Sequence, residues 1–216
     1  MTTPLFESFY PQHSLTDVAL PLISAALKED GAFADITSQA TVIDVKKGRA
    51  RLVAKEEGII CGLDLVPLLL GYFPLELKVE CHVEEGQWVS AGDLFLQLRG
   101  PLATILAAER SLINFLQHLS GVATLTARMV AKLSHGQSRP IKLLDTRKTL
   151  PGYRLLQKYA VRCGGGENHR EGLSDMYLIK ENHIRSAGSL EKAIVSCQKH
   201  REDTNVAAVI EVEVTN

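Results

Sequence analysis

The first hundred residues alternate between two spacings of hydrophobic positions. Apolar residues at every second position, the pattern of half-buried strands, occur at 49 to 56, 75 to 83 and 94 to 100. Apolar residues at helical spacing occur near Pro21 to Lys28 and Leu63 to Phe73. Because each element must bury one apolar face against another, we predict a small sheet with helices on one side, an α+β open-faced sandwich.

Two long helical patterns follow the predicted sheet. The dipeptide Ser120-Gly121 interrupts them, so we predict one helix before it and a second that reaches about Leu133. The organisation of the chain changes near Gly100, and we divide the chain into an N-terminal domain, residues 1–110, and a second domain, residues 111–216. The buried face of the first helix is expected to consist of Ile105, Ala108, Leu112, Phe115, Leu116 and Leu119.

From residue 141 onward, short apolar runs are separated by helical segments. The runs IKLLDT, MYLI and AVIEVEV begin about 30 to 35 residues apart, which is the length of a βα unit. This repeat predicts parallel α/β architecture, and we expect an α/β barrel. A complete barrel takes about 200 residues or more. The barrel is therefore expected to be incomplete here, and to continue beyond Asn216 or in another chain.

The composition is that of an ordinary globular protein. The 216 residues are 45% hydrophobic and carry a net charge of -1, which suits one large or two modest domains and argues against a general nucleic-acid or membrane-surface binder. No secretory signal pattern is visible, and Asp64 and Pro67 interrupt the longest apolar run, so we expect a cytoplasmic protein. The cysteines lack the spacing of zinc or redox sites and are expected to be reduced structural thiols: Cys61, Cys81, Cys163 and Cys197.

Positive charge is concentrated between Asp145 and Arg185. This segment holds eight Lys or Arg and two His against five carboxylates, whereas the rest of the chain holds sixteen Lys or Arg against twenty carboxylates. Arg147 and Lys148 follow one predicted strand and Lys180 follows the next, at the carboxyl ends where parallel α/β folds carry their chemistry. The segment therefore predicts a pocket for a small polyanion.

The same segment carries a long ordered motif. From Asp145 to Ile184 it reads DTRKTLPGYRLLQKYAVRCGGGENHREGLSDMYLIKENHI, and the runs ALKEDGAFADITS, GIICGL and AERSLINFLQHLSGVAT precede it. Together these runs, which cover nearly the whole chain, resemble the quinolinate phosphoribosyltransferase family. The resemblance implies Mg²⁺-dependent transfer of ribose 5-phosphate from phosphoribosyl pyrophosphate to quinolinate. It also implies release of pyrophosphate and CO₂ and formation of nicotinate mononucleotide for NAD biosynthesis.

The resemblance further implies roles for individual residues. Arg110 is implied to reach into a neighbouring subunit's site, which requires a homodimer or a higher homo-oligomer. Lys180 is expected to act in catalysis as well as in binding. Glu211 or Glu213 is expected to stabilise the ribose cation, and the sequence does not choose between them. Residues that bind the metal and the 5-phosphate are implied to fall beyond Asn216. Cations expected to bind the two substrates are Arg147, His169, Arg170 and Lys180 around quinolinate, and Lys148 near the phosphates.

Several residues near the motif have competing explanations. The run Gly164 to Gly166 fits either a helix stop or a phosphate cradle. His183 is expected to brace the loop at the strand end rather than to act in catalysis. Arg154 and Lys158 are four apart on a predicted helix, and we expect them on its exposed face.

Three rival functions remain open from the sequence. Lys180 at a strand end could form a Schiff base with a carbonyl substrate. The same fold could serve another substrate, as in the paralogue associated with molybdenum transport or in a nicotinate-specific phosphoribosyltransferase. The turn and strand rhythm of Val83 to Leu98 resembles a biotinyl or lipoyl carrier domain, although the carrier lysine is missing, and the chain could also be an inactive fragment.

Overall fold

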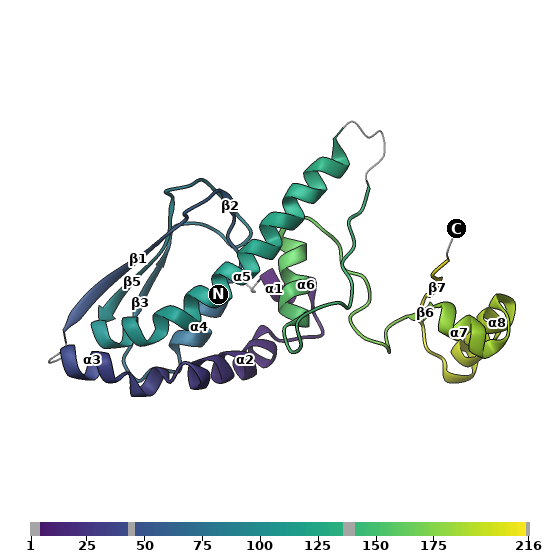
Figure 1. The fold of residues 1–216 in the computed structure, drawn as a ribbon, viewed down its shortest axis with the longest axis horizontal. Coiled ribbons are helices and arrows are strands. Elements are labelled where there is room, and N and C mark those ends of the chain that lie inside the picture. Colours follow the sequence, from purple (N-terminus) through teal and green to yellow (C-terminus); the bar gives the residue numbers. More distant parts are fainter. Residues whose placement is uncertain (1–4, 43–45, 136–140, 215–216) are drawn as a thin grey trace. The chain divides into compact units, whose positions relative to one another are not determined.

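The computed structural model describes residues 5–42, 46–135 and 141–214. The chain forms two compact units, Met1–Asn168 and His169–Asn216 (Figure 1). In the first unit the helices are α1 (Leu5–Phe9), α2 (Leu15–Glu29), a 3-10 turn (Ala32–Ala34), α3 (Ile36–Thr41), α4 (Leu65–Leu70), α5 (Leu102–Ser134) and α6 (Arg154–Cys163). Its strands are β1 (Lys47–Val53), β2 (Gly58–Ile59), β3 (Lys78–Cys81), β4 (Trp88–Val89) and β5 (Leu94–Pro101).

A three-stranded antiparallel sheet forms one layer of the first unit. Its strand order is β1-β5-β3, so the last strand lies between the other two, and β2 pairs separately with β4. Along β1, burial alternates: Ala50 and Leu52 are partly buried, whereas Arg49, Arg51 and Val53 are exposed. One face of the sheet therefore meets solvent while the other packs on helices, which confirms the predicted open-faced sandwich.

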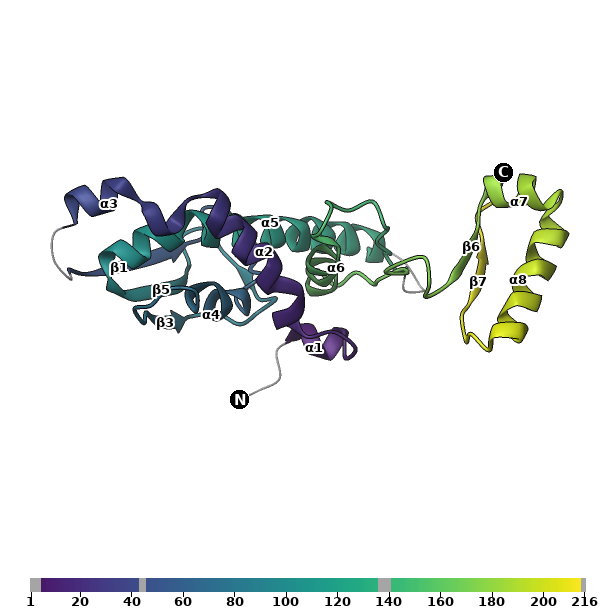
Figure 2. The same cartoon turned by 90° about the horizontal axis from the view of Figure 1, so that it is seen from below.

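The core of the first unit lies between this sheet and α5. Helix α5 contacts β1, β2 and β5, and α2 packs against α4 and α5 (Figure 2). Burial of each large apolar side chain is worth about 1.5 to 3 kcal/mol, so this layer supplies most of the driving force for folding of the unit. The side chains of α5 predicted to be buried from the helical spacing are all buried: Ile105, Ala108, Leu112, Phe115, Leu116 and Leu119.

The helix break predicted at Ser120-Gly121 is wrong. Helix α5 runs unbroken for 33 residues, and its buried stripe continues through Ala123 and Thr126. A glycine inside a helix costs only about 1 kcal/mol relative to alanine, which the continuing apolar face outweighs. The Ser120 hydroxyl bonds the backbone of Cys61, accepting from its N–H at 2.9 Å, and therefore ties the helix to the sheet layer. The predicted domain boundary after residue 110 lies inside this helix and stays a prediction.

Helix α6 packs on α5 and ends at the glycine run. Gly164 follows its last residue, and a Cβ built on Gly164 would lie 2.4 Å from the carbonyl oxygen of Ala123 on α5. Gly165 has a φ of +81°, in the region that favours glycine. The run is thus a helix stop at a close approach of two helices, which confirms one of the two readings of the sequence.

The second unit is a small parallel α/β arrangement. Strand β6 (Tyr177–Ile179) pairs in parallel with β7 (Ile210–Val212), and the helices α7 (Glu181–Ala187) and α8 (Leu190–Thr204) connect them. This confirms the predicted parallel architecture, and the described residues do not close into a barrel. The strand predicted at 141 to 146 is wrong in extent, because only a single parallel bridge between Leu144 and Glu167 forms there. No described helix is long and apolar enough to cross a membrane.

Glu85 is a partly buried acidic residue of the first unit. It accepts hydrogen bonds from the backbone N–H groups of Gly62 at 2.6 Å and Leu63 at 2.7 Å, and from the Tyr159 hydroxyl at 3.0 Å. Burial raises the pKa of Glu85 above 4.5, and these hydrogen bonds offset only part of that effect. The carboxylate therefore ties together the turn before α4 and helix α6.

The close approach at Gly164 predicts a stability difference between two glycines. Gly164→Ala should lower the free energy of unfolding by about 1 to 3 kcal/mol, because the new methyl group meets backbone atoms that cannot move aside. Gly121→Ala is the matched control, since nothing lies within 4 Å of its Cβ position, and it should raise stability by about 0.5 to 1 kcal/mol. Urea unfolding followed by circular dichroism measures both. Equal effects of the two substitutions would contradict the packing described here.

The raised pKa of Glu85 predicts a pH dependence of stability. The folded protein holds the Glu85 proton to a higher pH than the unfolded chain does, so the contribution of this group to the free energy of unfolding falls as pH rises from 4.5 through the folded-state pKa. Glu85→Gln should flatten the fall relative to the unchanged chain. Urea unfolding from pH 4 to pH 8 tests this, with the exposed Glu84→Gln as the control that should keep the original slope.

Candidate functional site

Arg147 and Lys148 lie in the loop between the Leu144 bridge and α6. The backbone of this loop is fixed by its own hydrogen bonds, in which Lys148 N–H donates to Thr146 Oγ1 at 3.1 Å and Thr149 N–H donates to the Arg147 carbonyl at 3.0 Å. The Asp145 N–H donates to the Glu167 carbonyl at 3.1 Å. Both cations predicted from the sequence are therefore on one ordered loop of the first unit.

The positive charges of this loop have no anionic partner among the described residues. Arg147 is half-buried, and its Nε–H is fully buried without a hydrogen-bond acceptor. Lys148 is exposed, and its ammonium group makes no ion pair with the described part of the chain. A buried donor without an acceptor costs about 1 to 3 kcal/mol, so an anion that reaches Arg147 would recover part of this cost. The loop has the electrostatics of an anion-binding segment.

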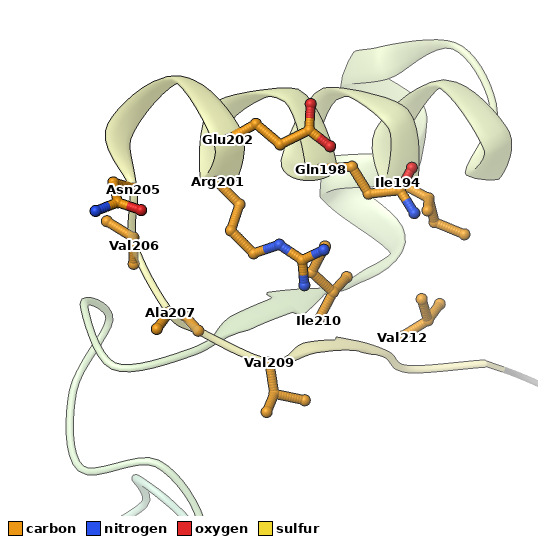
Figure 3. A pocket seen from close by; sticks show the side chains of 11 residues that line it. Ile194, Gln198, Arg201, Glu202, Asn205, Val206, Ala207, Val209, Ile210 and Val212 are labelled. Carbon is orange, nitrogen blue, oxygen red and sulfur yellow. The ribbon is translucent and has the colours of Figure 1, made fainter.

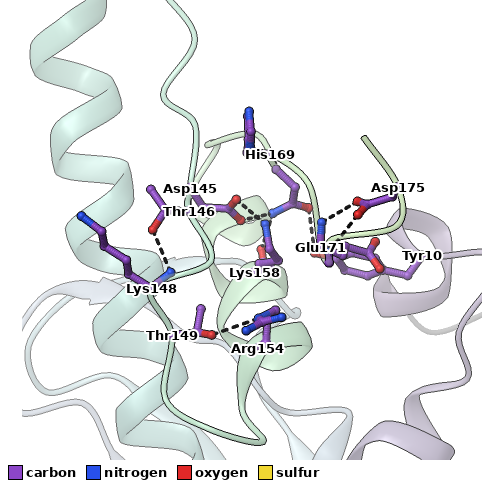
Figure 4. Close-up of polar contacts among 12 residues, drawn as sticks. Tyr10, Asp145, Thr146, Lys148, Thr149, Arg154, Lys158, His169, Glu171 and Asp175 are labelled. Atoms are coloured by element: carbon purple, nitrogen blue, oxygen red, sulfur yellow. Dashed lines mark hydrogen bonds and ion pairs between the residues drawn. The ribbon is translucent and has the colours of Figure 1, made fainter. Parts of the chain in front are cut away.

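A buried ion pair lies at the base of the same loop. The Lys158 ammonium contacts a carboxylate oxygen of Asp145, and the two side chains are 1% and 8% exposed (Figure 4). Asn168 donates to the other carboxylate oxygen at 2.6 Å and to the Lys158 carbonyl at 3.0 Å. The Tyr10 hydroxyl donates to Asn168 Oδ1 at 2.7 Å. Lys158 and Asn168 thus bind the Asp145 carboxylate directly, and Tyr10 holds Asn168 in place.

The prediction that Arg154 and Lys158 form an exposed helix face is wrong. Lys158 is enclosed, and Arg154 is half-buried, with its Nε–H donating to Thr149 Oγ1 at 3.2 Å. The sequence around Lys158 did indicate burial, because Lys158 precedes Tyr159 and lies between the apolar Leu155 and Ala160. The signal was insufficient alone, since nothing local identifies Asp145 as the partner of Lys158.

Four of the predicted site residues form two side-chain pairs in the second unit. Lys180 follows β6, and its ammonium lies 2.5 Å from a carboxylate oxygen of Glu213. His169 Nε2 lies 3.2 Å from a carboxylate oxygen of Glu211. Arg170 is 9% exposed and donates to the Met176 carbonyl at 3.2 Å. The two glutamates that the sequence left equivalent therefore contact different side chains, Lys180 and His169.

His183 has a structural role in this unit. Its Nδ1 accepts from the backbone N–H of Lys180 at 2.9 Å, in the reciprocal arrangement that caps the start of α7. This confirms the predicted brace at the strand end. The bond also fixes the backbone from which the Lys180 side chain extends.

Arg110 lies in the first turns of α5 and is exposed. Its guanidinium makes no hydrogen bond or ion pair with the described residues. An exposed Arg beside a buried helix stripe is compatible with the predicted contact to a second subunit, and that contact stays a prediction.

The described residues offer one group that could hold a metal ion, and it does not suit Mg²⁺. Atoms of Cys61, Glu85 and Cys163 lie within 4.8 Å of one another. A hydrogen bond with Cys163, together with burial, raises the pKa of the Cys61 thiol, which disfavours the thiolate needed for metal binding. Mg²⁺ prefers oxygen ligands, and both oxygens of Glu85 already accept backbone N–H groups. The cysteines are free thiols, as predicted.

A groove of about 810 Å³ lies between α8 and β7 (Figure 3). Its wall is mostly apolar, and Arg201 extends across it from α8 toward Ile210. It contains none of the predicted site residues. The groove is therefore separate from the predicted substrate-binding residues.

Comparisons with known proteins agree with the sequence motif. The family model of the quinolinate phosphoribosyl transferase N-terminal domain matches residues 35–120, and that of the C-terminal domain matches residues 122–216. Quinolinate phosphoribosyltransferase [decarboxylating] 1 of Nicotiana glauca is 41% identical over 204 residues, which cover 94% of this chain and 57% of that protein. The probable nicotinate-nucleotide pyrophosphorylase [carboxylating] of Bacillus subtilis is 39% identical over 193 residues, covering 89% and 64% of the two chains.

A solved structure extends the agreement to the fold. The nicotinate-nucleotide pyrophosphorylase from Francisella tularensis superposes with a TM-score of 0.86 and 41% sequence identity, covering all of this chain and 72% of that chain. The present chain thus spans between about half and three quarters of the lengths of these relatives. With both domain models matched in order, the chain belongs to the quinolinate phosphoribosyltransferase family.

Proposed function

We propose that this chain belongs to an enzyme that transfers a phosphoribosyl group from phosphoribosyl pyrophosphate to quinolinate, with loss of CO₂, and forms nicotinate mononucleotide and pyrophosphate. The observation that carries the proposal is the loop of the first unit, where Arg147 and Lys148 lack anionic partners and the Arg147 Nε–H lacks an acceptor. Both substrates are polyanions, and a planar guanidinium pairs with a carboxylate through two parallel hydrogen bonds.

The proposed division of labour follows the side-chain chemistry. Arg147 binds a carboxylate of quinolinate, and Lys148, an exposed point charge, binds phosphate oxygens. In the second unit His169, Arg170 and Lys180 are the side chains that the sequence motif assigns to quinolinate. The pyridine nitrogen attacks C1 of the ribose as the bond to pyrophosphate breaks, and the positive charge that develops on the ribose is stabilised by a carboxylate.

The two ion pairs of the second unit suggest how a carboxylate becomes available. The carboxylate of Glu213 contacts the Lys180 ammonium, and the carboxylate of Glu211 contacts the His169 ring. A quinolinate carboxylate that binds Lys180 or His169 must displace the glutamate from it. The released glutamate then faces the cationic ribose. After transfer, the alkylated ring nitrogen stabilises the electron pair left when the adjacent carboxylate departs as CO₂, and a proton replaces it.

The cofactor, assembly and location belong to the same proposal. Mg²⁺ is the proposed cofactor, because it commonly binds through substrate phosphates with few protein ligands. A homodimer would allow Arg110 to contact the partner's substrate. The cytoplasmic location stays a prediction, and the names of some plant relatives include the words mitochondrial or chloroplastic.

A lysine nucleophile is the weaker alternative. Schiff-base lysines are activated by burial in apolar surroundings. Lys180 is instead exposed and contacts a carboxylate. The proposed enzyme should therefore resist borohydride in the presence of carbonyl compounds. Comparison of quinolinate with nicotinate as acceptor distinguishes it from a nicotinate-specific relative.

Arg147→Ala should weaken quinolinate binding at least about tenfold, because a charge-assisted bidentate contact is worth about 1.5 to 3 kcal/mol. Isothermal titration of quinolinate into the chain measures the dissociation constant, and turnover to nicotinate mononucleotide is measured on the full-length natural protein. Arg128→Ala, at an exposed arginine of α5 outside the site, is the control and should change neither. Unchanged affinity in Arg147→Ala would refute the assignment of this residue.

Ion-pair exchange predicts opposite effects on binding and turnover. Glu213→Gln removes the competitor for Lys180, so quinolinate should bind several times more tightly. If Glu213 is the glutamate that faces the ribose, the turnover number should fall by about one hundredfold, in the range of lost electrostatic stabilisation. Steady-state kinetics at saturating phosphoribosyl pyrophosphate, repeated with Glu211→Gln, identifies which glutamate acts. Weaker binding in both variants would exclude exchange.

A further inference from the structure

Helix α6 holds the loop that carries Arg147 and Lys148 at both of its ends. At the start of the loop, Lys158 contacts the Asp145 carboxylate. At the end of the loop, the Leu150 N–H donates to Gln157 Oε1 at 2.9 Å, and Arg154 donates to Thr149 Oγ1 at 3.2 Å. The three side chains from the helix are Arg154, Gln157 and Lys158.

These three residues lie on one side of α6, the side that contacts the loop. Residues three and four apart in sequence lie on the same side of a helix, so positions 154, 157 and 158 present their polar groups together. Leu156 and Tyr159 of the same helix are buried in the core, and their burial fixes the rotation of the helix about its axis. The orientation of α6 in the core therefore determines where the loop is held.

The ion pair at the start of the loop is costly as a stabilising device. Lys158 is 1% exposed, and transfer of both charges from water cancels much of their attraction. Apolar residues of similar size often serve stability as well as a buried pair does. Apolar contacts, however, do not fix the orientation of a side chain as hydrogen bonds do. Lys158 contacts one oxygen of the Asp145 carboxylate and Asn168 donates to the other, so both the position and the rotation of the carboxylate are fixed.

We propose that Lys158 and Asp145 are positioning residues that set the place of Arg147 and Lys148 for substrate binding. Asp145 is two residues before Arg147, so a shift of its carboxylate moves the cation with it. The choice of quinolinate as the ligand in this proposal rests on the proposed function. The positioning of the loop itself is a property of the first unit and is measurable without any ligand.

The central test is a neutral replacement of the pair. Lys158→Met alone leaves a buried carboxylate without its cation and should lower the melting temperature. The double variant Asp145→Asn, Lys158→Met removes both charges and should recover most of that loss. Its affinity for quinolinate should nevertheless fall about tenfold or more, because misplacement of a binding group by about 1 Å has effects of this size.

Two further measurements separate positioning from stability. Hydrogen exchange of the amides of Thr149 and Leu150 should be faster in the double variant at a temperature where it is fully folded. In the full-length natural protein the KM for quinolinate should rise, while kcat changes much less, as expected when a ground-state contact is lost. The matched control replaces the exposed pair by Lys142→Met, Glu167→Gln, which should change neither exchange nor affinity.

The outcomes are distinct for each idea. Normal exchange and normal affinity in a folded double variant would overturn the positioning role. If the unchanged chain does not bind quinolinate, the proposed function fails, and faster exchange in the double variant still supports positioning. If the double variant does not fold, Gln157→Ala takes its place, because it frees the Leu150 N–H at the other end of the loop. Slow exchange at Leu150 in that variant would also overturn the proposal.

Discussion

The first unit depends on the close packing of α6 against α5. Gly164 permits an approach that even one methyl group would obstruct, with a Cβ position only 2.4 Å from a backbone carbonyl oxygen. This contact and the burial of Leu156 and Tyr159 fix the rotation of α6. The polar face of the helix is fixed with it, and so is the loop that the face holds. A packing constraint between two helices thereby determines the location of two cations.

The two units handle positive charge differently. In the first unit Arg147 and Lys148 have no anionic partner among the described residues, whereas in the second unit Lys180 and His169 each contact a glutamate. An unpaired cation attracts an anion directly. A paired one must exchange partners, which lowers affinity and releases a carboxylate. Under the proposed function, Arg147 and Lys148 bind an anion directly, whereas Lys180 binds one only by exchanging partners with Glu213.

Periodicity predicted much of the fold because apolar spacing reflects burial directly. It identified the buried face of α5 and the sheet strands, and it located Lys180 after β6. It failed at Ser120-Gly121, where long-range packing outweighs the low helix propensity of glycine. It failed at Lys158 for a related reason. Asp145, the partner of Lys158, is thirteen residues away across a loop. Asn168, which donates to the Lys158 carbonyl, and Tyr10, which donates to Asn168, come from other segments. The charge concentration drew attention to the loop of Arg147 and Lys148, but it did not predict the buried ion pair of Asp145 and Lys158.

The hydrogen bond from Tyr10 to Asn168 joins residues 158 positions apart. Contacts of such separation close very long loops and form late, since their entropy cost must be met before they contribute. The support beneath the cation loop is therefore completed only when the beginning of the chain has docked against the segment after α6. Until then the apolar faces of α1 and α6 remain open to solvent, and aggregation competes with folding. The contact of Tyr10 with Asn168 is thus among the last that this unit needs in order to hold the loop of Arg147 and Lys148.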